Sequence, residues 1–136
     1  MLLFLSCNFN TVRENKEEDK KDAEKITQKF FSLIKENKKQ EIFKLFSSKF
    51  FIETNENELN QIIDLTNKEA GSISNYSLYE WETTIMKGTD PKNDYLLVYD
   101  VTRNKINTQE IFTLEKEGDK IKIIGYKVNL DLVTTK

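Results

Sequence analysis

The spacing of apolar residues changes once along this chain, and that change limits the folds open to it. From residue 22 to residue 71, apolar side chains recur every three or four residues, as on one face of a helix. From residue 74 to residue 130 they alternate with polar ones, and β-branched and aromatic residues are common. The sequence therefore predicts an α+β domain in which helices come first and a sheet follows.

Three N-terminal helices are expected before the sheet. The first begins at Asp22, whose side chain can cap its free backbone N–H groups. The second is short, holds the apolar residues of 42–46 and runs on toward the next phenylalanines. The third begins at Thr54 or Asn55 and ends at Gly71, where a glycine can adopt the left-handed conformation that terminates helices.

Four strands are expected after the helices. They lie near residues 74–86, 95–103, 108–116 and 121–130. The connections between them are short, and one holds Gly88 and the only proline, so consecutive strands should be antiparallel neighbours. Gly125 interrupts the last strand, where a bulge would bend the sheet. The expected fold is thus three helices packed on a curved four-stranded antiparallel sheet, in a single domain of residues 22–132.

Composition excludes several classes of function. The 136 residues fit one domain, and 21 basic against 23 acidic residues give a net charge of −2, so nucleic acid is not expected as a partner. Histidine is absent, which removes the usual general base and the usual zinc ligand. Asp90, Asn93 and Asp94 offer oxygen ligands but lack the spacing of a calcium-binding loop. We therefore expect no metal and no cofactor.

The first seven residues, MLLFLSC, place an apolar run directly before the only cysteine, Cys7. This stretch resembles the lipobox of bacterial lipoproteins, in which a diacylated cysteine becomes the new N-terminus. The resemblance implies that residues 1–7 are the remnant of a lipoprotein signal. It also implies that Cys7 anchors the protein to a membrane of the bacterial cell envelope.

A polar stretch, NFNTVRENKEEDKK, follows the cysteine at residues 8–21. Its lack of periodicity predicts a flexible tether between the lipid and the domain. Two alternatives stay open: residues 1–9 form an edge strand in which Cys7 is an ordinary buried thiol, or the apolar start is an artefact of the gene start or of cloning.

Two longer motifs carry a family resemblance. They are IFKLFSSKFF at residues 42–51 and EIFTLEKEGDKIKIIGYKVN at residues 110–129, the latter a strand, a tight turn and a strand. With the order of helices and strands, they resemble the nuclear transport factor 2-like (cystatin-like) superfamily, and especially its small bacterial envelope lipoproteins of unknown function. The resemblance implies a cone-shaped domain whose sheet wraps a helix and leaves a pocket at its open end. It does not imply an activity, because this superfamily supports many.

In enzymes of this superfamily, an acidic residue in the cone acts as general base and a tyrosine polarises the substrate. Glu110 alternates with Phe112 and Leu114 on the face that we expect to point inward, and Tyr99 has the same orientation on the preceding strand. These two residues are the catalytic candidates. Burial would raise the pKa of a carboxylate toward working pH, and the tyrosine hydroxyl could polarise a substrate. The alternative is that Glu110 lies at the exposed start of its strand and Tyr99 is a core aromatic.

Three aromatic residues are candidates for ligand binding: Trp81, Tyr99 and Tyr126. Aromatic side chains on a concave sheet can form a platform for a ligand, although they more often fill a core.

We expect a membrane-tethered, non-enzymatic envelope domain that binds a small ligand in its cone or a protein partner. The alternatives are a ketosteroid-isomerase-like or dehydratase-like enzyme, and a secretion or assembly accessory that binds protein through its sheet. A homodimer is also left open.

Overall fold

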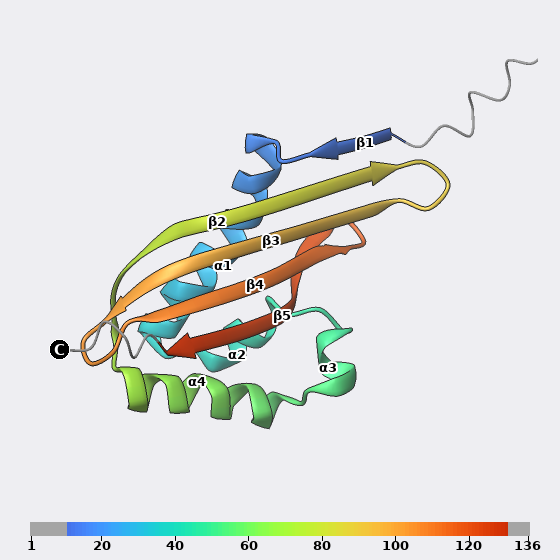
Figure 1. Cartoon of the computed structure of the whole chain (residues 1–136). Helices are drawn as coiled ribbons and strands as arrows, with labels where there is room; N and C mark the ends of the chain where they lie inside the picture. The colour runs from blue at the N-terminus through green and yellow to red at the C-terminus, as the bar shows by residue number, and fades with distance from the viewer. Residues whose placement is uncertain (1–10, 131–136) are drawn as a thin grey trace, which may run out of the picture.

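The computed structural model describes residues 11–130, which form an antiparallel sheet with helices packed on one face (Figure 1). The elements are, in order, β1 (Thr11–Glu14), α1 (Glu17–Glu36), α2 (Lys39–Phe43), α3 (Phe50–Glu53), α4 (Glu56–Ala70), β2 (Ile73–Lys87), β3 (Lys92–Arg103), β4 (Thr108–Glu117) and β5 (Lys120–Leu130). The strands lie side by side in chain order from β1 to β5, and each is antiparallel to its neighbours. The α+β class and the antiparallel order are therefore as predicted.

The expected count and order of elements were wrong. The described residues hold five strands and four helices, rather than four and three, and the helices are not all N-terminal because β1 precedes them. β1 pairs with the far end of β2, so that Thr11 lies opposite Lys87 and Glu14 opposite Thr84. Such a short strand is stabilised by a partner distant in sequence, which local periodicity does not reveal.

Most of the expected tether is ordered structure. Residues 11–21 contain β1 and the start of α1, whereas residues 8–21 had been expected to form a flexible linker. Arg13 of β1 donates two hydrogen bonds to the buried carboxylate of Asp19 on α1, with nitrogen–oxygen distances of 2.6 and 2.9 Å. Glu17 and Glu18 also lie in the first turn of α1, where acidic side chains interact favourably with the helix dipole and stabilise the helix. The charges that suggested a linker therefore begin the helix. Cys7 lies outside the described residues.

The expected second helix is divided into α2 and α3. Between them the chain pairs with β5: the Ser47 N–H donates to the Ile123 carbonyl at 2.8 Å, and the Ile123 N–H donates to the Leu45 carbonyl at 2.9 Å. This connection fixes the first half of β5 against the helical layer.

The remaining elements agree closely with the predictions from the sequence. Strands β2 to β5 cover the expected ranges and extend them by at most three residues at either end. Asn55 caps α4 in a capping box with Glu58, and Gly71 ends that helix as expected, although its φ of 89° and ψ of −179° are an extended conformation open to glycine rather than the left-handed helical one. Ile124 is an extra residue on β5, because Thr113 and Leu114 face Gly125 and Ile123. The bulge thus lies at Ile124, directly before Gly125, where an interruption of the strand was expected.

The core lies between α1 and the inner face of the sheet. Phe30 and Phe31 of α1 are fully buried and both meet the ring of Phe112 nearly edge-on, with centroids 5.1 and 5.6 Å apart. No helix within residues 11–130 is long and apolar enough to span a bilayer.

Candidate functional site

Glu110 is the most deeply buried charged group near the inner face of the sheet. It lies on β4 between Tyr99 of β3 and Val128 of β5, and it has no exposed surface. A buried carboxylate needs a partner of opposite charge or several hydrogen-bond donors. The structure supplies both.

Arg103, at the end of β3, is the partner that sequence reasoning missed. Its Nη2 lies 2.8 Å and its Nε 3.1 Å from Glu110 Oε2. Its Nη1 donates to the Asn67 side chain at 3.0 Å and to the Gly71 carbonyl at 2.8 Å, at the C-terminal end of α4. Arg103 follows Tyr99 by an even number of residues, so strand alternation could have placed its side chain inward.

The other oxygen of Glu110 accepts a hydrogen bond from the Tyr126 hydroxyl at 2.6 Å, and the Thr108 hydroxyl donates to Oε2. Burial of the Tyr126 hydroxyl, and then the negative charge of Glu110, raise the pKa of Tyr126 well above its ordinary value. Tyr126 is therefore a neutral donor. Both oxygens of Glu110 have partners, which holds the carboxylate as half of an ion pair rather than as a free base.

Tyr99 and Glu110 lie directly opposite each other, yet their polar ends do not meet. The Tyr99 hydroxyl bonds to the Thr27 hydroxyl on α1, 2.6 Å away. Burial raises the pKa of Tyr99 to about 12. The two candidate catalytic residues are thus neighbours that belong to separate hydrogen-bond networks.

The three candidate ligand-binding aromatics do not form one platform. Trp81 and Tyr126 lie in the same cross-strand row but are separated by Leu97 and Phe112. Lys20 of α1 lies over the Trp81 ring, with its ammonium nitrogen 5.4 Å from the ring centroid. Of the three aromatics, Tyr126 alone lines the pocket described next.

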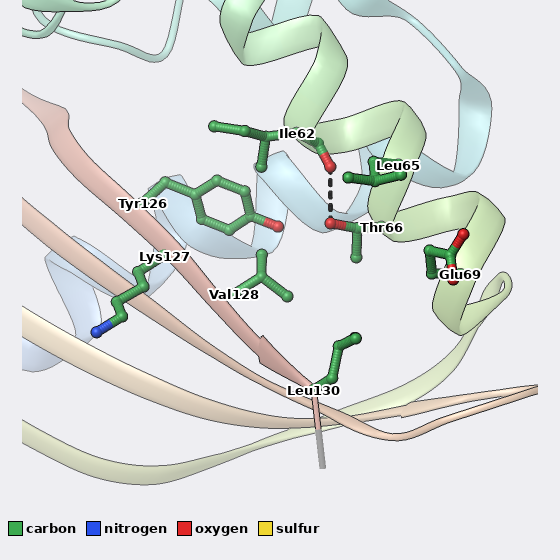
Figure 2. Close-up of a pocket in the computed structure, with 8 residues that line it drawn as sticks. All are labelled: Ile62, Leu65, Thr66, Glu69, Tyr126, Lys127, Val128 and Leu130. Atoms are coloured by element: carbon green, nitrogen blue, oxygen red, sulfur yellow. Dashed lines mark hydrogen bonds between the residues drawn. The ribbon is translucent and has the colours of Figure 1, made fainter. Parts of the chain in front are cut away.

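That pocket lies between α4 and the second half of β5, and it encloses about 380 Å³ (Figure 2). It is lined by Ile62, Leu65, Thr66 and Glu69 of α4 and by Tyr126, Lys127, Val128 and Leu130 of β5. Figure 2 shows the Tyr126 ring and Val128 directed toward α4, whereas the ammonium of Lys127 points away. The volume is in the range of small-molecule sites, and the walls are mainly hydrocarbon.

No model of a protein family matches this sequence, and no curated protein matches it. The family resemblance stays a prediction.

Sequence reasoning found Tyr126 but not the α4 wall of the pocket. The buried stripe of α4 holds Leu59 and Ile63, which the helical period identified. The helical period had placed Ile62 on the same apolar face, but in the structure Ile62 and the unassigned Leu65 lie beside the buried stripe and are exposed, Leu65 by 58%. An apolar residue outside the core-facing stripe of a helix is the signal that could have indicated the pocket.

The Thr66 hydroxyl donates to the Ile62 carbonyl at 2.7 Å, so its polar atom is occupied within the helix. The chemistry that this pocket can perform is recognition of an apolar group. Within the described residues, no nucleophile with an adjacent base and no free buried carboxylate faces it.

Proposed function

We propose that the protein is a non-enzymatic binding domain whose pocket between α4 and β5 receives an apolar group. The observation that carries this proposal is the gathering of exposed apolar side chains at one place. Of the six large hydrophobic residues exposed in the described part of the chain, three line this pocket: Ile62, Leu65 and Leu130. Apolar surface concentrated in a concave site is typical of a surface that a ligand covers.

The network around Glu110 argues against the enzyme alternative. A general base must accept a proton from its substrate, and this requires an accessible carboxylate oxygen. Glu110 is fully buried and ion-paired with Arg103, and the Tyr126 hydroxyl stands between it and the pocket. The arrangement supports a structural role in which Arg103 and Glu110 join α4 to the sheet.

Binding is tested with a neutral apolar dye, N-phenyl-1-naphthylamine, whose fluorescence rises in apolar surroundings. The full chain is used with Cys7→Ser, so that lipidation is blocked. We expect Leu65→Gln to weaken binding at least about tenfold, because it places an amide in the hydrocarbon wall. The matched control is Ile52→Gln on α3, which alters a residue that is 79% exposed and does not line the pocket. Equal dye binding by the two variants, or none by the Cys7→Ser chain, would contradict the proposal.

We also propose that the domain is held at the membrane of a bacterial cell envelope through acylated Cys7. The support is the MLLFLSC motif and its position close before β1. The test is Cys7→Ala in the native host, followed by fractionation. A shift of the protein from the membrane to the soluble fraction is expected, and unchanged membrane association would refute the anchor.

A further inference from the structure

The second half of β5 is an open edge of the sheet. β5 is the last strand, and β4 pairs with it along its length. On the other side, the backbone bonds that join β5 to the rest of the described chain all involve Ile123, which bonds to Leu45 and Ser47. Nothing in residues 11–130 therefore pairs with the outer edge of residues 125–130, and backbone groups at such an edge can pair with another strand.

The pocket lies between α4 and the second half of β5, next to this edge. Tyr126, Lys127 and Val128 all line it. Tyr126 and Val128 point toward α4, and Lys127 between them lines the pocket although its ammonium points away, so the pocket reaches the backbone of β5. The pocket thus combines a row of backbone hydrogen-bonding groups with the apolar side chains of α4.

We propose that the natural occupant of this pocket is an extended polypeptide segment that adds to β5 as a sixth strand. Its inward side chains would pack on Ile62 and Leu65, and its backbone would pair with residues 125–130. A groove between an edge strand and a helix suits this mode of recognition, because backbone pairing gives affinity and alternate side-chain pockets give selectivity. The inference rests on the proposed binding function and specifies its ligand class.

Charge indicates the composition of the segment. β5 carries Lys120, Lys122 and Lys127 and no acidic residue, and Lys127 alone lies in the open half. Lys127 has no ion-pair partner among the described residues, so an acidic residue on the outer face of the added strand would lie across from it. The segment that fits has apolar residues inward and an acidic residue outward.

A lipid chain fits less well. A hydrocarbon tail cannot satisfy the backbone groups of an edge strand. A fatty-acid carboxylate would also meet Glu69, whose own carboxylate lines the pocket without an ion-pair partner among the described residues. The combination of edge and charge therefore favours a peptide.

The test uses capped heptapeptides of the pattern acetyl-XTXEXTX-amide, in which X is valine, leucine or phenylalanine. Affinity for the full Cys7→Ser chain is measured by calorimetry. We expect at least one member to bind and to lose at least about tenfold when its glutamate is replaced by lysine. Leu65→Gln should weaken it by a similar factor, and Ile52→Gln should leave it unchanged.

Backbone pairing is tested by N-methylation of the best peptide. Adjacent amides in a strand point to opposite edges. One peptide therefore carries N-methyl groups at the two central X positions, which blocks one edge. A second peptide carries them at the Glu and a neighbouring Thr, which blocks the other edge. One pattern should abolish binding, and the other should change it less than about threefold. Amide hydrogen exchange within residues 125–130 should slow with the peptide but not with the dye.

The outcomes separate this inference from the proposed function. If the two N-methylation patterns weaken binding equally, the peptide docks by its side chains and strand addition is wrong. If the dye binds but none of the peptides does, the ligand is not a polypeptide strand, although the pocket remains a binding site. The same conclusion follows if the fatty acid dodecanoate displaces the dye where the peptides fail. If neither dye nor peptide binds, both proposals fall.

Discussion

The guanidinium of Arg103 and the carboxylate of Glu110 lie 2.8 Å apart, and their side chains are 2% and 0% exposed. The pair spans the turn between β3 and β4, and Arg103 also binds the Gly71 carbonyl at the end of α4. One buried ion pair therefore joins two strands to the helix that forms a wall of the pocket.

Glu110→Gln should destabilise the fold strongly, because it leaves Arg103 buried without its charge partner. Loss of one member of a buried pair typically costs about 3–5 kcal/mol. The double variant Arg103→Met with Glu110→Gln should recover much of that loss, because no unpaired charge remains. The free energy of unfolding in urea is the measurement. The control is Glu115→Gln, whose partner Lys49 is exposed, so that solvent screening keeps the cost small. A cost for Glu110→Gln no greater than the control's would show that burial does not determine the strength of this pair.

Tyr99→Phe should lower stability near neutral pH and lose this effect in alkali. At pH 8 the substitution removes the bond to Thr27 and costs about 1 kcal/mol. Burial raises the pKa of Tyr99 to about 12. The unfolded chain releases the same proton near pH 10, as free tyrosine does, to within about a unit. The unfolded state thus binds fewer protons above that pH, so the stability that Tyr99 contributes is complete below pH 10 and declines as the pH rises toward 12. The difference in unfolding free energy between the two proteins, measured from pH 8 to 11.5 or so, should shrink. A constant difference would contradict this account.

Gly125→Ala should destabilise the bulge in β5 through a single contact. A Cβ at Gly125 would lie 2.4 Å from the Thr113 hydroxyl oxygen on β4. Thr113 is exposed and can turn aside, so we expect a loss of only about 1–2 kcal/mol. Thr113→Ala should remove the conflict, so the double variant should be more stable than the sum of the two single changes predicts. Thermal unfolding of all four proteins measures this, and strict additivity would place the strain elsewhere.

The parts of the fold that were predicted correctly have local signals. Alternation placed β2 to β5, and the glycines at 71 and 125 marked the end of α4 and the bulge. β1 was missed because its four residues gain their stability from pairing with β2 residues that lie 70 to 76 positions later in the chain. The break between α2 and α3 has a similar cause, since the backbone there bonds to Ile123.

The site was harder to predict than the fold because it depends on tertiary placement. Alternation was enough to suggest that Glu110 and Tyr99 point inward. It could not show that Arg103 would neutralise Glu110, or that Thr27 would take the Tyr99 hydroxyl. The pocket forms only where α4 lies beside β5, and the spacing of residues within α4 or within β5 does not show how close the two elements lie.

The pairing of β1 with β2 decides which end of the sheet would lie nearest to an anchor at Cys7. Thr11 lies beside Lys87, at the end of the sheet where β2 turns into β3, whereas the pocket is at the opposite edge and toward the other strand ends (Figure 1). If Cys7 carries the lipid, the four backbone steps to Thr11 span at most about 14 Å. So short a connection would keep Thr11, and with it the hairpin between β2 and β3, close to the headgroups, while the pocket beside β5 lies at the far end of the sheet.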